Sequence, residues 1–431
     1  MNSSENNVIT GLQWGNEGKK KLTDFFANRS EAIVRFNGSS SGGHPINAGG
    51  ESFTLDYLPC GIHHDGKLCV IAAGTALDLD KAADEIVALK NAGVLKARLH
   101  ISERCPLILD FHKKQELLEA RAMYRNMGWL MNERGYGAAL SDMYGALGVT
   151  AGDLLHPLVL REKIKHVMKI KNELFLKVFN EAPVEPNAIC DEILKKAEAL
   201  LPYVSPVEGL IAKAVADNAG VLFEGCDGSM NDAQCGLYPS LAPGRRSAAE
   251  VFLSCGLRHN TSLRVIGAAK AYCAKSGDGP FITEEKSTVG AFLRARGGEF
   301  NELTGEQRRT GWLDLPALAY SVRANSADVL ALTKLDALTG IDELKLCTAY
   351  RIDGKEVTAG DITAEEAARA VPVYETLEGW KEELQGCADF SRLPRQTQSY
   401  IRFIEEYVGL RVIWAGLGRQ WGNALYASEE R

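Results

Sequence analysis

Short apolar runs rich in β-branched residues recur along the whole chain. They lie at 32–36, 68–72, 221–225, 327–333 and 411–416. Their length and composition are typical of buried β-strands. Between them, apolar residues recur at helical spacing near 79–89, 112–127, 161–180, 189–217, 284–296, 315–325 and 397–408. The first of these helices has Asp78 as its expected N-cap. Because strands that alternate with helices build parallel sheets, the pattern predicts an α/β fold with a mostly parallel central sheet and helices on both faces.

The organisation of the chain shows no internal division. No linker rich in proline, glycine and serine separates two halves, and no repeat is visible. We therefore expect residues 1–431 to form a single domain with a helical excursion around 100–217. Loops rich in glycine, serine and charged residues occur at 37–50, 225–247 and 297–312. On an α/β scaffold such loops carry most binding and catalytic residues.

Composition narrows the class of protein. The 431 residues are 45% hydrophobic and 24% charged, with a formal net charge of −7. This balance is typical of a soluble globular protein, and it indicates no nucleic-acid or membrane partner. No run approaches the roughly 20 apolar residues of a membrane span, and residues 1–7 lack the basic and apolar regions of a signal peptide. We therefore expect a cytoplasmic protein. Its ten scattered cysteines include no Cys-x-x-Cys pair and are expected to be reduced thiols.

The first candidate for chemistry is the segment GLQWGNEGKKK at 11–21, which directly follows the apolar run 8–10. A strand, a glycine-rich turn and a helix in this order present backbone N–H groups and a helix N-terminus to anions. The segment is not a Walker A loop, because Gln13 stands where that motif needs glycine and Lys20 where it needs serine or threonine. By itself, the segment indicates either a phosphate-binding loop or a solvated basic turn.

Together with later blocks, this segment points to a family. GLQWGNEGKKK resembles the signature Gly-x-Gln-Trp-Gly-Asp-Glu-Gly-Lys-Gly-Lys of adenylosuccinate synthetases. Further blocks resemble that family in the same order along the chain: SERCPLILDFH, KAYCAKSGDGPFITE, RRTGWLD, TKLDALTG, KLCTAYR and YETLEGW. The resemblance covers essentially the full length. It implies a P-loop-NTPase-like α/β fold with a mainly parallel sheet, and a homodimer.

The resemblance also implies a reaction. In the family, GTP phosphorylates the 6-oxygen of inosine monophosphate, and the amine of aspartate then displaces the phosphate to give adenylosuccinate. The partners implied for this chain are GTP, an amino acid with aspartate as the candidate, and a small-molecule acceptor. Mg²⁺ is the implied cofactor.

The nucleotide-binding positions of the family are kept. They are Gly15, Gly18, Lys19 and Lys21 in the phosphate loop, Gly43 beside it, Lys334 and Asp336 in the guanine-recognition block, and Gly416 near the last guanine loop. An aspartate carboxylate can accept from the guanine N1–H and 2-amino group, which ATP lacks. The resemblance makes His44, Asn16 and Lys19 the catalytic residues and gives Asn16 and the carbonyl of Gly43 a place at the metal. As an imidazolium, His44 suits the charge of a transferring phosphoryl group.

The acceptor side departs from the family. Asn16 replaces the aspartate that acts as the catalytic base. The positions implied to bind the acceptor or the amino acid are Ser41, Asn132, Arg134, Asp227, Thr304, Glu306 and Arg308. Thr304 and Arg308 match the family, whereas Ala146 and Ala242 replace an arginine and a threonine that hold the acceptor phosphate. Because each charge-assisted bond to a phosphate contributes roughly 1.5–3 kcal/mol, we expect inosine monophosphate to bind poorly.

We therefore predict a GTP-dependent ligase that forms C–N bonds and acts on an acceptor other than standard inosinate. Asparagine has no proton-accepting state near neutral pH, so an acceptor that is already ionised, such as a carboxylate, fits Asn16. The main rival is a lactam acceptor deprotonated by Asp227 or Glu306. Three further functions stay open at this point: ordinary adenylosuccinate synthesis by a divergent enzyme, a non-catalytic GTP-binding paralogue, and the activity of the phage branch of the family, which uses deoxyguanylate.

Overall fold

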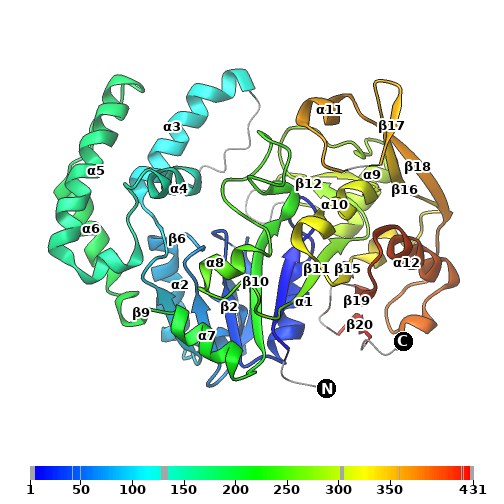
Figure 1. The fold of residues 1–431 in the computed structure, drawn as a ribbon, viewed down its shortest axis with the longest axis horizontal. Coiled ribbons are helices and arrows are strands. Elements are labelled where there is room, and N and C mark those ends of the chain that lie inside the picture. The colour runs from blue at the N-terminus through cyan, green and yellow to red at the C-terminus, as the bar shows by residue number, and fades with distance from the viewer. Residues whose placement is uncertain are drawn as a thin grey trace.

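The computed structural model describes residues 5–40, 42–48, 50–127, 134–300, 305–358, 360–418, 420 and 422–427. Figure 1 shows a central sheet flanked at one end by α3, α5 and α6 and at the other by the strands β16 and β18. Within the described residues, no helix is both long and apolar enough to cross a membrane.

The central sheet confirms the predicted α/β fold. Its strand order among the described residues is β20-β19-β15-β11-β1-β10-β2-β5-β7-β9. These strands are β1 Asn7–Gly11, β2 Ala32–Arg35, β5 Leu68–Ile71, β7 Arg98–Ser102, β9 Val204–Ser205, β10 Val221–Gly228, β11 Arg264–Lys270, β15 Val329–Thr333, β19 Val412–Gly416 and β20 Ala424–Tyr426. Neighbouring strands pair in parallel from β9 to β19, and β20 pairs antiparallel with β19. The fold is therefore mostly parallel, as the hydrophobic pattern predicts.

Both faces of this sheet are buried. Successive residues point to opposite faces of a strand, and in β1 the side chains of Val8 and Ile9 are both fully buried but belong to different apolar clusters. Ile9 packs in the cluster that contains Leu22 of α1 (Lys19–Ala27) and Ile86 of α2 (Leu79–Asn91). Val8 packs in the cluster that includes Val251 of α8 (Glu250–Ser254) and Ile211 of α7 (Glu208–Ala216). Helices therefore cover both faces, which explains why the strands read as continuous apolar runs.

The remaining α-helices among the described residues are α3 Asp110–Met127, α4 Tyr136–Tyr144, α5 Pro157–Lys177, α6 Pro186–Ala197, α9 Thr288–Gly297, α10 Leu315–Asn325, α11 Ala364–Arg369 and α12 Arg395–Val408. A second sheet joins β14 Leu313–Asp314, β16 Glu343–Ile352, β17 Lys355–Val357 and β18 Val371–Glu378. Asp78 caps α2 as expected, because its side chain accepts from the backbone N–H groups of Asp80 and Lys81.

One predicted helix is wrong as a single element. The segment near 189–217 is divided into α6, the short strand β9 and α7. Pro202 and Pro206 lie in the interruption. Proline cannot donate the backbone hydrogen bond that a helix interior requires, and its ring clashes with the preceding turn. Residues 100–217 contribute the helices α3 to α7, and the division of the chain into domains stays a prediction.

The parallel sheet also decides where the loops meet. The carboxyl ends of parallel strands lie at one edge of a sheet, and in open α/β sheets ligands bind at that edge. The segments that follow β1, β10, β11, β15 and β19 therefore converge on one side of the molecule. These segments and strand ends carry the phosphate loop, Asp227, Lys334, Asp336 and Gly416, whereas Gly43 and His44 follow the neighbouring strand β2.

A buried carboxyl lies in the second sheet, at the end of β14. Asp314 is only 2% exposed and caps α10, since its Oδ1 accepts from the backbone N–H of Ala317 at 3.1 Å. The same oxygen accepts from the hydroxyl of Tyr350 in β16 at 2.5 Å. Burial raises the pKa of Asp314 from 3.8 to about 6, although the two hydrogen bonds act in the opposite direction.

This raised pKa predicts a pH dependence of stability. Between the ordinary pKa of 3.8 and about 6, the folded chain binds a proton that the unfolded chain has released. The free energy of unfolding should therefore fall as the pH rises through this window, by about 3 kcal/mol at most. Asp314→Asn keeps an oxygen that can cap α10 and should remove this part of the slope, so that the variant is more stable near neutral pH. Urea unfolding of both proteins across this range checks it, and an identical slope in both would contradict it.

Candidate active site

The loop between β1 and α1 has a backbone shaped for anion binding. Gly15, Asn16 and Gly18 have φ values of 82°, 57° and 77°, in the left-handed region. Gly18 is the N-cap of α1 and has no side chain to satisfy the first N–H groups of that helix. A Cβ on Gly15 would lie 2.0 Å from a carboxylate oxygen of Asp227, so only glycine fits there. The loop therefore leaves backbone N–H groups of a helix N-terminus available to a phosphate.

A buried carboxylate holds this loop from inside. Glu17 is fully buried, and its Oε1 accepts from the backbone N–H groups of Gln13 at 3.1 Å and Gly15 at 2.9 Å. The backbone carbonyl of Glu17 accepts from the hydroxyl of Thr333, the last residue of β15, at 2.6 Å. Gln13 donates in turn to the carbonyl of Lys270 at the end of β11 at 3.2 Å. These bonds fix the loop to two neighbouring strands of the sheet.

The three lysines that follow the loop reach three different segments. Lys19 Nζ lies 2.5 Å from Glu17 Oε2 and donates to the carbonyl of Asp227 near the end of β10. Lys21 donates to the carbonyls of Gly418 at 3.1 Å and Asn423 at 2.6 Å. Burial lowers the pKa of Lys21 to about 8, although the Asp336 carboxylate acts in the opposite direction. The lysines therefore join the phosphate loop to the ends of β10 and β19.

Lys20 does not behave as a solvated side chain. Its Nζ donates to the carbonyl of Gly42 at 3.0 Å and to the carbonyl of Gly43. Gly43 precedes β3 (His44–Ala48) and is the residue whose carbonyl the family resemblance assigns to a metal ion. A lysine ammonium therefore contacts the atom that the resemblance assigns to Mg²⁺. No local pattern signals this contact, since the two residues are 23 positions apart.

His44 is held by a partner that sequence reasoning missed. Its Nε2 lies 2.8 Å from Oδ1 of Asp24 in α1, and the ring is only 7% exposed. A carboxylate in this position orients the imidazole ring. Asp56 performs a similar task for the preceding loop, because its Oδ1 accepts from Ser40 at 2.9 Å and from the backbone N–H of Gly43 at 2.8 Å. The only sequence signal for either residue is an acidic side chain close to the loop.

Lys334 belongs to a buried charged cluster. The carboxylate of Glu299, which is fully buried, contacts the ammonium groups of Lys334 at 2.8 Å and Lys270 at 3.0 Å. It also accepts from Tyr272 at 2.6 Å and lies 3.4 Å from Arg308. Burial alone would raise the pKa of Glu299, but the two ammonium groups outweigh it and hold this pKa well below its ordinary value. Glu299 therefore positions both a predicted guanine residue and a predicted acceptor residue.

Asp336 lines a hollow of about 550 Å³ beside this cluster. The other lining residues are Ala295, Arg296, Glu383, Gln385, Gln420 and Asn423. Burial raises the pKa of Asp336, while Arg296, Lys21 and Lys334 act in the opposite direction. Gly416 lies close by, since a Cβ on it would be 3.5 Å from the backbone nitrogen of Lys334. The structure thus brings Lys21, Lys334, Asp336 and Gly416 together, and the hollow offers carboxylate and amide groups to a planar polar ring.

The acceptor side is organised around Arg246. This side chain is 4% exposed, and its Nε lies 3.5 Å from Oδ2 of Asp227. It also donates to the hydroxyl of Tyr136 at 3.3 Å. Asn231 donates to the other carboxylate oxygen of Asp227 at 3.1 Å. Both oxygens of Asp227 are therefore engaged, whereas Asn16 on the adjacent loop is exposed.

The remaining predicted residues are only partly brought together. Arg134 donates to the hydroxyl of Ser40 at 3.3 Å and so reaches the loop before Gly43. Arg308 is held by Glu299, and Glu306 is exposed. Ser41, Asn132 and Thr304 lie outside the described residues.

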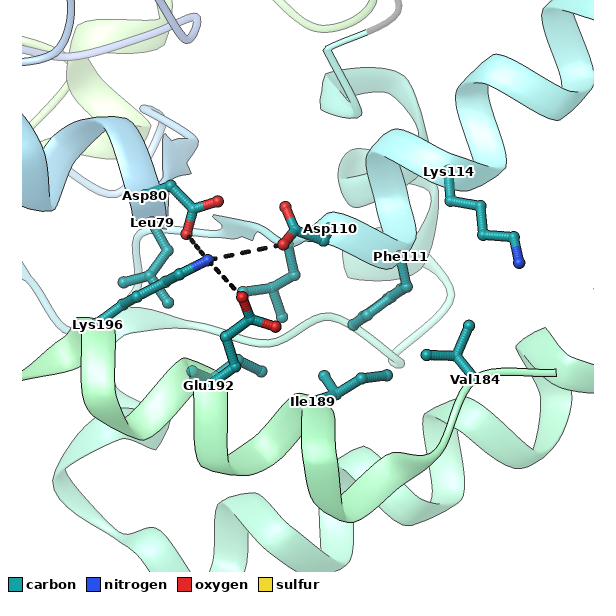
Figure 2. Close-up of a pocket in the computed structure, with 11 residues that line it drawn as sticks. Leu79, Asp80, Asp110, Phe111, Lys114, Val184, Ile189, Glu192 and Lys196 are labelled. Atoms are coloured by element: carbon teal, nitrogen blue, oxygen red, sulfur yellow. Dashed lines mark ion pairs between the residues drawn. The ribbon is translucent and has the colours of Figure 1, made fainter. Parts of the chain in front are cut away.

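A second hollow, of about 270 Å³, lies away from these loops. It is bounded by α2, α3 and α6, and none of its lining residues belongs to the phosphate-loop site. Figure 2 shows its apolar lining, which includes Leu79, Phe111 and Ile189, beside a charged cluster. In that cluster Lys196 pairs with Asp80 at 2.6 Å and with Glu192 at 3.0 Å. Each charged side chain that lines the hollow has a partner of opposite sign, so these described lining residues offer no unpaired charge for catalysis.

The described residues fit a nucleotide better than they fit a metal ion. The phosphate loop, its lysines and the hollow at Asp336 supply donors for phosphates and acceptors for a base. For Mg²⁺, by contrast, Asn16 is neutral and the Gly43 carbonyl already accepts from Lys20. Among the residues that the structure describes, no three His, Cys, Asp or Glu side chains are grouped to hold a metal ion. Mg²⁺ in nucleotide sites keeps several waters and takes one or two carboxylates besides the phosphates, and at this loop the two groups named for it are a neutral amide and a carbonyl that already has a donor.

Comparison with known proteins agrees with this geometry. The model of the adenylosuccinate synthetase family matches residues 8–424. An adenylosuccinate synthetase of Synechococcus is 37% identical over 415 residues, covering 96% of this chain and 92% of that protein. One from Desulfovibrio desulfuricans is 38% identical over 420 residues, covering 96% of this chain and 98% of that protein.

Solved structures agree as well. The fully ligated adenylosuccinate synthetase from Plasmodium falciparum superposes with a TM-score of 0.89 at 28% identity, covering 98% of this chain and all of that one. The succinoaminodeoxyadenylate synthetase of cyanophage S-2L, bound to dGMP and dATP, shares the fold with a TM-score of 0.58 at 16% identity and covers 98% of this chain and 95% of that one. The chain therefore belongs to the adenylosuccinate synthetase family, and it is a GTP-dependent ligase that forms a C–N bond.

Proposed function

We propose that this chain transfers the γ-phosphoryl group of GTP to an acceptor oxygen, that the amine of an amino acid then displaces the phosphate, and that the acceptor differs from inosine monophosphate. One observation carries the proposal. The phosphoryl-donor side has its loop, its lysines and the His44–Asp24 pair in place. At position 16, beside that donor side, an asparagine stands where a base is needed.

The donor side accounts for the choice of nucleotide. The carboxylate of Asp336 can accept two hydrogen bonds from the N1–H and 2-amino group of guanine, whereas adenine offers no such pair. Lys334 is fixed beside it by Glu299, so its aliphatic stem can lie against the base. Lys19 and the N–H groups at the start of α1 would receive the phosphates.

During phosphoryl transfer, negative charge develops on the phosphoryl oxygens, and a cationic group that is already oriented toward them stabilises it. The His44 ring is held by Asp24 at 2.8 Å, and the protonated ring would stabilise the charge that develops on the phosphoryl oxygens. Because Asp24 lies one turn inside α1, the helix that begins at the phosphate loop also sets the direction of the imidazole. His44 is thus the proposed catalytic residue and Asp24 the residue that positions it.

The acceptor follows from Asn16. A lactam oxygen becomes a good nucleophile only when a base removes the ring N–H proton, and an asparagine side chain cannot take that proton. The carboxylate of Asp227 already contacts Arg246 and Asn231, and Glu306 is exposed to solvent. Neither carboxylate is therefore the preferred substitute for the missing catalytic base. A carboxylate acceptor is already an anion. Its oxygen would attack the γ-phosphorus to give an acyl phosphate and GDP, and the amine would then form an amide and release phosphate.

A second acceptor has its own support. The relatives that match along almost the full length carry the name adenylosuccinate synthetase, and this favours inosine monophosphate with aspartate. Arg245 and Arg246 lie shortly after Ala242, the position of the lost threonine, and could bind the phosphate of inosine monophosphate.

We also propose a homodimer, which exposed apolar side chains such as Tyr144, Leu158 and Val159 support.

The guanine assignment predicts a change in nucleotide preference. Asp336→Asn exchanges a double acceptor for a mixed donor and acceptor, so the preference for GTP over ATP should fall by about tenfold to a hundredfold. Calorimetric titration with both nucleotides measures it. Glu382→Gln is the matched control, since it removes a neighbouring carboxylate that does not line the hollow. Equal affinity of the unchanged protein for GTP and ATP would sink the assignment.

The roles of His44 and Asp24 predict a separation of binding from turnover. His44→Asn should leave GTP affinity within about threefold and lower the rate of phosphoryl transfer by about a hundredfold or more. Asp24→Asn should lower the rate by about tenfold alone and have little further effect in the His44→Asn background, because it acts through the ring. His166→Asn, on the exposed surface of α5, serves as the control. Additive losses in the double variant would show that Asp24 acts independently of His44.

The acceptor proposal predicts a trapped intermediate. With GTP and a panel of carboxylates, hydroxylamine should yield an acyl hydroxamate, and Asn16→Asp should not accelerate that reaction. Mass spectrometry of the products detects both amides and adenylosuccinate. Robust adenylosuccinate formation at micromolar inosinate would instead establish the ordinary reaction. GTP binding without turnover on any acceptor, including inosinate, would identify a non-catalytic paralogue.

A further inference from the structure

The contact of Lys20 with the loop at Gly42 and Gly43 is not used by the function proposed so far. Lys20 is the second residue of α1, and its side chain crosses to the loop that precedes β3. The ammonium donates to two successive carbonyls, those of Gly42 at 3.0 Å and of Gly43. Gly42 and Gly43 both have φ in the left-handed region, at 70° and 77°. The loop backbone therefore turns its carbonyl oxygens toward the phosphate loop, and a protein cation meets them there.

The acidic groups around this position are already engaged. The carboxylate of Asp56 accepts from Ser40 and from the backbone N–H of Gly43. The carboxylate of Asp24 pairs with His44. Asn16, on the phosphate loop, carries no charge. In the described part of the chain, the cation seen at the Gly43 carbonyl is therefore a lysine ammonium, and the carboxylates of Asp24 and Asp56 beside it already accept from protein donors.

The sequence shows the same change in charge. Relative to the signature Gly-Asp-Glu-Gly-Lys-Gly-Lys, this loop reads Gly-Asn-Glu-Gly-Lys-Lys-Lys. Asn16 removes one negative charge and Lys20 adds one positive charge, so the loop gains two positive charges in sum. Two positive charges are what one Mg²⁺ ion contributes. The two substitutions thus supply, from the protein, the charge that the phosphates of GTP otherwise obtain from a divalent ion.

We propose that Lys20 takes the place of a divalent metal ion at the Gly43 carbonyl, so that this chain binds GTP with little dependence on Mg²⁺. The inference rests on the proposed GTP binding at this loop. An ammonium donates to carbonyl and phosphate oxygens, as a metal ion binds them. Both cannot occupy the same carbonyl, because two like charges at contact distance repel each other. Lys20 is therefore a nucleotide-binding residue that also excludes the ion.

Nucleotide binding with and without the metal tests this directly. The fluorescence of a GDP derivative and calorimetry with GTP give the Kd in millimolar Mg²⁺ and in EDTA. For the unchanged protein the two Kd values should agree within about threefold. Lys20→Gly, which restores the residue of the signature, should bind GTP at least about tenfold more weakly in EDTA and recover in Mg²⁺. Lys20→Met keeps the length of the stem and should behave in the same way.

Two further measurements test whether the effect is specific to Lys20 or follows from the loss of any lysine charge. Lys169→Met removes an exposed charge from α5 and should change neither Kd. With GTP present, Mn²⁺ titration followed by electron paramagnetic resonance should show weaker Mn²⁺ binding to the unchanged protein than to Lys20→Gly. Equal Mg²⁺ dependence in the unchanged protein and in Lys20→Gly would overturn the inference while leaving GTP binding intact. Absence of GTP binding in every condition would overturn the proposed function, and the inference with it.

Discussion

The burial of Glu17 is the constraint on which the candidate site depends. A carboxylate without solvent access is costly unless donors surround it. Glu17 meets that requirement by accepting from the backbone N–H groups of Gln13 and Gly15 and by pairing with Lys19. These bonds wrap the segment after β1 around one side chain. The backbone conformation that these bonds fix sets the positions of Asn16, the three lysines and the first turn of α1.

A second buried carboxylate, that of Glu299, fixes the segments around Lys334 and Arg308 in a similar way. Glu299 gathers Lys270, Lys334 and Arg308, which come from three separate segments. Breaking such a buried cluster by removing one partner is costly, because an uncompensated charge remains. Glu17 and Glu299 are joined through Thr333 and Lys334, which are adjacent in the chain. The phosphate loop and the hollow at Asp336 are therefore parts of one rigid hydrogen-bonded unit.

The acceptor side is built differently. Asp227 and Arg246 satisfy each other in part, and Tyr136 from α4 completes the contact. This arrangement leaves Asn16 exposed between a rigid donor side and a pair of opposite charges. The two sides are nevertheless joined directly, since Lys19 donates to the carbonyl of Asp227 and Asn231 donates to the carbonyl of Trp14.

Much of the fold is predictable from local patterns. The helix at 315–325 is predicted correctly, since its capping aspartate, its apolar spacing and its ends are all encoded within a dozen residues. The single helix predicted at 189–217 is wrong, because apolar spacing alone does not register Pro202 and Pro206. In the candidate site, sequence patterns single out the phosphate loop, His44 and Asp336, whose roles stay predictions. They do not identify Asp24, Glu299 or the contact of Lys20, whose meaning depends on which segment lies opposite.

The sequence by itself determined the parallel α/β fold, the predicted anion-binding loop and the family. Each of these depends on short segments, in which the spacing and types of neighbouring residues are sufficient for the prediction. Only the tertiary structure decided where three consecutive lysines point. Lys19 reaches Asp227, Lys20 reaches Gly43 and Lys21 reaches Asn423, at separations of 208, 23 and 402 residues. Long flexible side chains carry no directional signal in the sequence. Their partners are chosen by the order of strands in the sheet, which brings the ends of β1, β10 and β19 to one edge.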